Sequence, residues 1–383
     1  MSEVESIPEA KLWVGMDVHK DTVMIAVFRD AGQEPIQVQR LPNDHRKLRR
    51  FFERISRDGR IHACYEASGA GFVLHRAITG WGHDCEVIAP SLIPTRAGER
   101  RKHDRGDAIQ LARLYRAGEL VVIRVPTETQ ERVRDLVRCR NTLQREVLKS
   151  RQYILKFLTR RSLVFRDGTN WTQRHLAWLE RIRSERLLED EDAVIFDEYL
   201  SLLSYKLQRR DELDRKIEEI ALSPLYRTAV ERLCAFRGIK THSAMVLISE
   251  IGDFRRFESP RQLMAYLGLV PSEHSSGDRE RRGSITKAGN SHCRHVFVQA
   301  AWSARRRPAV KRALKERQRG QPSSVVAHSW KAQQRLYKLF HRIHAHRPSG
   351  IAAVAVAREM VGFIWAVMHE LEVENQIETK TAA

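Results

Sequence analysis

Apolar and polar positions change rhythm along the chain, and each rhythm predicts a different kind of structure. In the first part, the short runs LWVGMD, TVMIAVF and PIQVQRL alternate with turn residues, which predicts three antiparallel strands. The run DHRKLRRFFERIS follows with apolar residues at helical spacing and with Asn43 or Asp44 as its N-cap. Beyond it, the strand patterns IHACYEA and CEVIAP alternate with helical patterns at GFVLHRAITGWG and at roughly 104–118.

Three regions follow from these patterns. The order of strands and helices over 1–126 is the one expected of a ribonuclease-H-like α/β domain. Over 127–223 apolar residues keep a roughly seven-residue repeat that basic residues interrupt, which favours an antiparallel helical hairpin or a dimer stalk over one continuous zipper. The region 224–383 is mainly helical and includes the polar stretch PSEHSSGDRERRGSITKAGN, which we expect to be a loop.

The charge of the chain indicates its kind of partner. A formal net charge of +19 favours a polyanion, most simply nucleic acid. A membrane surface has no support, because Arg358 and Glu359 interrupt the longest apolar run, which is typical of a buried or interface helix. The N-terminus has no export signal, and the five scattered cysteines indicate reduced thiols. We therefore expect a cytoplasmic protein.

Four carboxylates fall at the ends of predicted elements in the first region. Asp17 ends the first strand, Glu66 ends the strand IHACYEA, and Asp104 and Asp107 share one face of a first helical turn. Each acid alone is explained by capping or by the helix dipole. Because the carboxyl ends of neighbouring parallel strands open on one crevice, however, we expect the four to converge there. Such a set would repel itself by several kcal/mol without a cation. Its hard oxygen ligands suit Mg²⁺ or Mn²⁺ acting on a phosphodiester.

A basic run precedes the paired aspartates. Its residues Arg100, Arg101 and Lys102 are expected to steer the phosphodiester toward the metal. Asp21 and Asp84 fall in turns and are left out of the acidic set.

The polar stretch around residue 276 allows two interpretations. It is a solvated loop that contacts phosphate, or it presents Ser275 or Ser276 as a nucleophile toward phosphorus. In either case its basic residues would contact phosphoryl oxygens. These are Arg279, Arg281, Arg282 and Lys287.

Six motifs in order carry a family resemblance. GMDVHKDT, YEASGAG, KHDRGDA, ISEIGDFRRF, LGLVPSEHSSG and GSITKAGN extend over almost the whole chain and resemble the IS-one-ten family of insertion-sequence transposases, also called DEDD transposases. The resemblance implies a RuvC-like domain, a coiled-coil linker and a C-terminal transposase domain. It assigns catalysis to the same four acids and to Ser276, with Ser275 as the second candidate. His103 and Gly106 depart from the residues that many members have there, which leaves the shape of the local loop open.

The resemblance also implies a mechanism and partners. Members are understood to join a circular element to its target, with both double-stranded DNAs specified by a structured bridge RNA. The serine would attack a phosphodiester and form a phosphoserine link, with carboxylate-bound Mg²⁺ (or Mn²⁺) activating the phosphate. Domains of different protomers would complete each site, so a homodimer that assembles to a tetramer is implied, in the bacterial cytoplasm and associated with the nucleoid.

Three other interpretations remain open. A Holliday-junction endonuclease would use the four carboxylates and water without the serine. A sugar-kinase or actin-like ATPase also carries an aspartate in its first hairpin, but no second glycine-rich nucleotide motif is apparent. A non-catalytic nucleic-acid-binding scaffold would use the acids only as caps.

Overall fold

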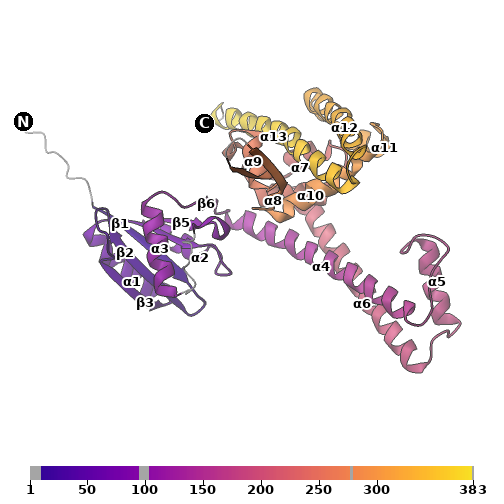
Figure 1. Ribbon diagram of the computed structural model, residues 1–383, viewed down its shortest axis with the longest axis horizontal. Helices are drawn as coiled ribbons and strands as arrows, with labels where there is room; N and C mark the ends of the chain where they lie inside the picture. Colours follow the sequence, from indigo (N-terminus) through magenta and orange to yellow (C-terminus); the bar gives the residue numbers. More distant parts are fainter. Residues whose placement is uncertain (1–9, 95–102, 277–278, 382–383) are drawn as a thin grey trace, which may run out of the picture. The chain divides into compact units, whose positions relative to one another are not determined.

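The computed structural model describes residues 10–94, 103–276 and 279–381, with the side chains of 273–282 and 372–381 left out. The chain divides into two compact units, Met1–Pro126 and Thr127–Ala383. Figure 1 shows a mixed sheet with helices in the first unit and mostly helices in the second. Each unit is described by itself.

One six-stranded sheet forms the framework of the first unit, in the order β3-β2-β1-β4-β5-β6. Strands β2 and β3 continue antiparallel from β1, whereas β4 and β5 are parallel to β1. The strands are β1 (Lys11–Val18), β2 (Thr22–Arg29), β3 (Gln37–Pro42), β4 (Arg60–Glu66), β5 (Asp84–Ile88) and β6 (Val122–Ile123), and the helices are α1 (His45–Ile55), α2 (Val73–Gly80) and α3 (Asp104–Arg116). The expected order of elements is present and is consistent with a RuvC-like fold. Only β6 was not expected, because two residues are too few to show alternation.

The helices cover opposite faces of this sheet. Leu12, Val14 and Met16 of β1 pack in the core that α1 and α2 complete. Since successive side chains of a strand point to opposite faces, Asp17 belongs to the other face, the one that α3 covers through Ala108 and the residues around it.

Gly15 lets α3 lie directly on β1. A Cβ atom at this position would be 2.3 Å from the carbonyl oxygen of Ala108 and 2.4 Å from the backbone nitrogen of Ala112. Both atoms belong to helix backbone, which cannot turn aside as a flexible side chain could. The absence of a side chain at Gly15 therefore sets how closely the N-terminal turn of α3 approaches the end of β1.

The second unit is built from long helices and one hairpin. It contains α4 (Glu128–Thr159), α5 (Gln173–Ser184), α6 (Asp190–Ala221), α7 (Arg227–Cys234), α8 (Thr241–Ile251), α9 (Pro260–Tyr266), β7 (Pro271–Ser276), β8 (Arg279–Ile285), α10 (Ser291–Ala301), α11 (Arg312–Arg317), α12 (Ser323–His344) and α13 (Ser349–Thr381). Helix α4 begins at a capping box in which Thr127 and Gln130 satisfy each other's backbone amides.

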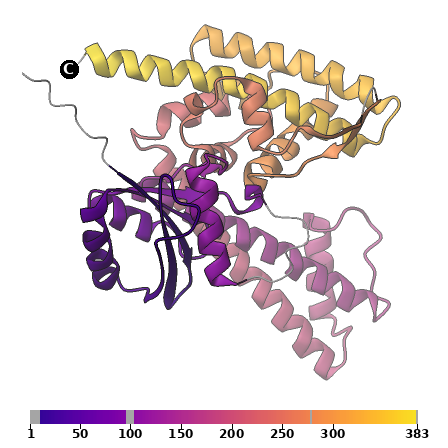
Figure 2. The same cartoon turned by 60° about the vertical axis from the view of Figure 1, so that its left-hand side comes forward.

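Helices α4 and α6 form an antiparallel pair and lie side by side in both views (Figures 1 and 2). Ion pairs join Arg140 to Asp214 near one end and Arg161 to Asp192 near the other. Apolar side chains between them, including Val147 of α4, pack with α5. The helical hairpin is therefore present, whereas a supercoiled linker stays a prediction.

The stretch that the sequence predicted as a polar loop is a two-stranded antiparallel hairpin, β7–β8. That expectation was wrong because strand patterns are recognised by alternating apolar residues. PSEHSS and RERRGSI have almost none.

Helix α13 has a segment, Ser349–Leu371, that is long and apolar enough to span a membrane by length and composition. More than half of its apolar window, 56 %, is buried inside the protein, where Ala352, Val356 and Met360 join the largest apolar core. The segment is accounted for as a core helix, and no membrane protein is indicated.

The role of Gly15 can be tested by adding one methyl group. Gly15→Ala should destabilise the first unit by about 2 kcal/mol, because the backbone of α3 must move. Hydrogen exchange measured by mass spectrometry should show faster exchange in peptides that cover α3. Gly106→Ala is the matched control, since nothing lies within 4 Å of its added Cβ, and it should stabilise α3 by roughly 0.5–1 kcal/mol. If peptides that cover α3 exchanged hydrogen equally slowly in the two variants, this account of the packing would be contradicted.

Candidate functional site

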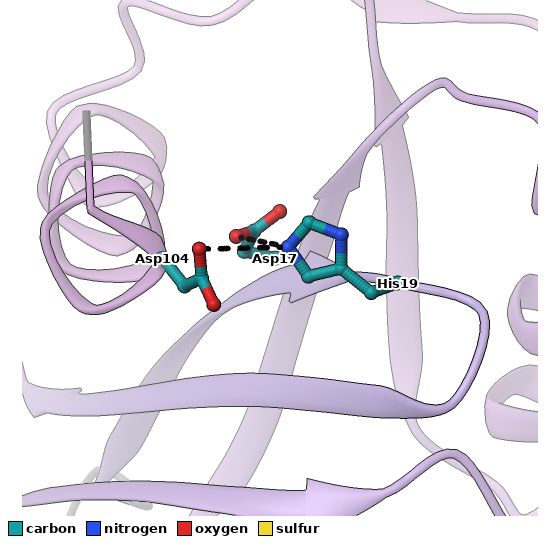
Figure 3. A group of neighbouring side chains, drawn as sticks. All are labelled: Asp17, His19 and Asp104. Carbon is teal, nitrogen blue, oxygen red and sulfur yellow. Dashed lines mark hydrogen bonds and ion pairs between the residues drawn. The ribbon is translucent and has the colours of Figure 1, made fainter.

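Two of the four expected carboxylates meet at the end of strand β1. Asp17 is the penultimate residue of β1, and Asp104 is the first residue of α3, 87 positions later in the sequence. Together with His19 they form a group whose ligand atoms all lie within 4.8 Å of one another. Figure 3 shows the three side chains pointing toward one another from a strand, a turn and a helix.

The distances within this group are short. The Nε2 atom of His19 lies 3.1 Å from Oδ2 of Asp17 and 3.7 Å from Oδ1 of Asp104. Oδ2 of Asp104 accepts a hydrogen bond of 2.6 Å from Nη2 of Arg40 on β3. The two oxygens of Asp104 thus have separate surroundings, because one faces the group and the other is held by Arg40.

Glu66 and Asp107 lie on the same side of the sheet but outside this 4.8 Å group. In the parallel register, Tyr65 of β4 pairs with Met16 of β1, so Glu66 follows on the strand beside Asp17 and shares its face of the sheet. Asp107 is one turn into α3, and its backbone amide donates to the carbonyl of His103. The fold therefore brings all four acids to one end of the sheet, and of these four Asp17 and Asp104 belong to the 4.8 Å group.

The donor set of this group fits a divalent ion. Carboxylate oxygens and an imidazole nitrogen are ordinary metal ligands, and neighbouring ligands of an octahedral ion with bonds of about 2.1 Å are about 3 Å apart. The 3.1 Å between Nε2 of His19 and Oδ2 of Asp17 is a hydrogen-bonding distance and is also close to that separation. The side chains of Asp17 and Asp104 remain 20 % and 41 % exposed, so an ion and a substrate could reach them.

His19 and Arg40 were missed as site residues by sequence reasoning. His19 lies inside the motif GMDVHKDT, and the signal that could have found it is its spacing, two residues after Asp17 along an extended backbone. Arg40 gives no such signal, because its partner Asp104 is 64 residues away in the sequence. Asp84 was expected in a turn but is the first residue of β5; it is paired with Arg60 and His62 and lies outside the group, as expected.

The basic run before α3 cannot be compared with the structure. Arg100, Arg101 and Lys102 lie outside the described residues. Of the basic residues expected near the serines, Lys287 is described and is exposed, with a φ angle of +57°.

The two candidate serines end strand β7. The register places Ser276 opposite Arg279 and Ser275 opposite Glu280 of β8. The register also places Arg281 opposite His274, and Arg282 opposite Glu273. A basic residue of β8 therefore lies beside Ser276 and an acidic one beside Ser275.

A buried ion network lies where the chain leaves this hairpin. The Glu250 carboxylate, whose side chain is 1 % exposed, pairs with the Arg138 guanidinium of α4. Arg138 donates to its two oxygens at 2.6 and 2.8 Å, and Nδ2 of Asn290 donates at 2.8 Å. Burial alone raises the pKa of Glu250, but the hydrogen bonds from Arg138 and Asn290 outweigh it and hold that pKa below its ordinary value.

Asn290 connects this network to the segment that contains β7 and β8. Its side-chain Oδ1 caps α10 by accepting a hydrogen bond from the backbone amide of Cys293. The backbone amide of Asn290 donates to the backbone carbonyl of Tyr266. The preceding Gly289 has a φ angle of +68°, and a Cβ there would be 1.9 Å from the same carbonyl oxygen. The motifs ISEIGDFRRF and GSITKAGN thus meet, and they fix the base of the β7–β8 hairpin.

The exposed face of α12 is strongly basic. Lys331, Arg335, Lys338 and Arg342 recur at intervals of four, three and four residues, which places them on one side of the helix. They line a groove of about 450 Å³ beside α13. One acid also lines this groove, Glu359, and it pairs with Arg335.

The sheet unit, with carboxylates gathered at one end of the sheet, and the mostly helical second unit are consistent with a RuvC-like enzyme. Comparisons with known proteins identify the family. A family model described as "Transposase", for the DEDD transposases of IS110 type, matches residues 14–162, and one described as "Transposase IS116/IS110/IS902 family" matches residues 230–316. A putative transposase of Sinorhizobium fredii is 36 % identical over 361 residues, which cover 94 % of this chain and 88 % of the relative. The transposase for insertion sequence element IS1533 of Leptospira borgpetersenii is 31 % identical over 341 residues, 88 % of this chain and 98 % of the relative.

The chain therefore belongs to the IS110 family of insertion-sequence transposases, the IS-one-ten family of the sequence analysis. As a transposase, it is an enzyme that cleaves and recombines DNA.

Replacing Glu250 tests the buried network. Glu250→Gln should lower the free energy of unfolding at pH 7 by about 2 kcal/mol, less than the roughly 3–5 kcal/mol of a fully buried pair, because the Arg138 side chain is 41 % exposed. The pKa of Glu250 is lower in the folded state than in the unfolded state, where a glutamate has a pKa of about 4.3. Its ionised form therefore stabilises the folded protein at pH values above about 4.3. This stabilisation is lost as the pH falls through the folded-state pKa. The difference between wild type and variant should therefore shrink below about pH 4.3.

Urea unfolding followed by circular dichroism across that pH range measures the effect. The matched control is Glu231→Gln, which removes the exposed pair with Arg227 and should cost less than about 1 kcal/mol. A Glu250 variant as stable as this control at pH 7 would show that the network contributes nothing.

Proposed function

We propose that this transposase is an RNA-guided recombinase that joins its element to target DNA through a phosphoserine intermediate. In this proposal 1–126 is the RuvC-like nuclease domain, 127–223 the stalk and 224–383 the serine transposase domain. The observation that carries it is the meeting of Asp17 and Asp104, far apart in sequence, in one metal-compatible group, in a chain whose family recombines DNA.

The carboxylates would act by holding Mg²⁺ or Mn²⁺. A bound ion of this kind supplies Lewis-acid polarisation of a phosphodiester oxygen. Asp17 and Asp104 would be its central ligands, while Glu66 and Asp107 would complete its surroundings. Arg40 keeps one oxygen of Asp104 engaged, so that the other stays directed toward the group.

Ser276 would carry the covalent step. Its hydroxyl oxygen would form a bond to phosphorus and lose its proton, and the bond from phosphorus to one bridging deoxyribose oxygen would break. That oxygen would leave as a hydroxyl, and the proton it takes up balances the one that the serine gives up. Attack by the hydroxyl of another DNA end on the phosphoserine would reverse these changes, so that strand exchange needs no ATP. The choice of Ser276 over Ser275 rests on the family resemblance, in which the nucleophile is the serine that precedes the loop glycine.

The partners in this proposal are double-stranded DNA, a structured bridge RNA and further copies of the chain. The net charge of +19 and the basic face of α12 support polyanionic partners. The guide RNA, and the assembly of dimers into a tetramer, rest on the family resemblance.

Covalent trapping tests the role of the serine. Wild type and Ser276→Ala are incubated with DNA that carries the element junction and target, the co-purifying RNA and Mg²⁺, and protein–DNA adducts are separated by denaturing electrophoresis. The variant should lose both the adduct and DNA cleavage, by roughly 10⁴-fold or more, because the nucleophile itself is missing.

Two further variants make the result interpretable. Ser275→Ala should keep the adduct within about tenfold of wild type, and Asp17→Asn should lose the adduct while still binding DNA. Continued cleavage by Ser276→Ala would favour a junction endonuclease that uses the carboxylates and water. Loss of the adduct in Ser275→Ala alone would move the nucleophile to Ser275.

A further inference from the structure

His19 occupies a defined position at the carboxylate group. It follows the last residue of β1, two positions after Asp17, and extended residues at this spacing share a face of the sheet. Its backbone amide donates to the carbonyl of Thr22 at 2.9 Å, and its carbonyl accepts from Nδ2 of Asn43, also at 2.9 Å. The turn that carries the imidazole is thus held at both sides of the residue.

The imidazole presents one nitrogen to both acids. Nε2 is the atom within 3.1 Å of Asp17 and 3.7 Å of Asp104, and Figure 3 shows this ring nitrogen turned toward both carboxylates. The His19 side chain is 53 % exposed, so water can accept a hydrogen bond from Nδ1. That tautomer leaves the Nε2 lone pair free for a metal.

Arg40 orients the second carboxylate of the group, that of Asp104. It engages Oδ2 of Asp104 and leaves Oδ1 as the oxygen nearer to His19. An outer hydrogen bond that orients a ligating carboxylate in this way is a regular feature of metal sites. One oxygen of Asp17, one oxygen of Asp104 and one nitrogen of His19 therefore lie within 4.8 Å of one another, close enough to share one ion.

We propose that Nε2 of His19 is a direct ligand of the divalent ion held by Asp17 and Asp104, and that it shifts the preference of the site from Mg²⁺ toward Mn²⁺. This inference rests on the proposed function, in which the carboxylates hold a metal, and it adds a residue and a selectivity to that site. Mg²⁺ favours oxygen ligands and retains its water, whereas first-row transition ions accept imidazole nitrogen readily. An all-carboxylate site would lack this source of discrimination.

Metal binding by the full-length chain, without DNA, tests the inference. Mn²⁺ affinity is measured from the free-ion signal in electron paramagnetic resonance, and Mg²⁺ affinity from its competition with Mn²⁺. His19→Ala should weaken Mn²⁺ binding by about tenfold or more and Mg²⁺ binding by much less. Pulsed measurements on bound Mn²⁺ should show echo modulation from a directly coordinated imidazole nitrogen in the wild type and none in the variant.

Two controls separate the possible failures. His45→Ala removes an exposed imidazole of the same unit and should change neither affinity nor modulation. Asp17→Asn should abolish tight binding of both ions.

If Asp17→Asn weakens binding while His19→Ala weakens both ions equally and the wild type shows no nitrogen modulation, His19 only hydrogen-bonds to Asp17 and the inference is wrong. If Asp17→Asn binds both ions like wild type, the metal site of the proposed function fails as well.

Discussion

Direct contact between the backbone of α3 and strand β1 at Gly15 is the constraint on which the candidate site depends. The site needs a carboxylate at the end of a strand and another at the start of a helix to approach within a few ångströms. A side chain at position 15 would hold the helix away from the sheet, since its first carbon would already overlap the backbone of Ala108 and Ala112. Close packing of helix on strand, rather than any attraction between acids, therefore brings Asp104 to Asp17.

Charge balance is the second requirement of this arrangement. Two carboxylates placed together repel each other, and the fold places the Arg40 guanidinium against Asp104 and the polar His19 ring beside both acids. Both partners come from the antiparallel strands β1–β3 and the turns between them, so the hairpins of the sheet contribute electrostatics as well as packing. In the second unit the same principle operates in a buried form, where Arg138 and Asn290 satisfy Glu250 and fix the base of the β7–β8 hairpin.

Local pattern was sufficient to predict the sheet, its helices and the positions of Asp17 near the end of β1 and Asp104 at the start of α3, because strand alternation and helical spacing are properties of short segments. The hairpin β7–β8 was missed because its strands lack the apolar alternation by which strands are recognised. The contributions of Arg40 and of Asn290 could not be predicted either, since their partners are 64 and 40 residues away. Such pairings depend on the tertiary fold, and one sequence carries no local trace of them.

The central claim is that Asp17 and Asp104 bind one ion jointly, and a calorimetric double-mutant cycle tests it most directly. Mn²⁺ is titrated into wild type, Asp17→Asn, Asp104→Asn and the double variant. Joint binding predicts that each single variant loses the tight site and that the double variant loses no further affinity, because the effects of residues acting on one ion are not additive. Wild-type affinity in either single variant would contradict the account.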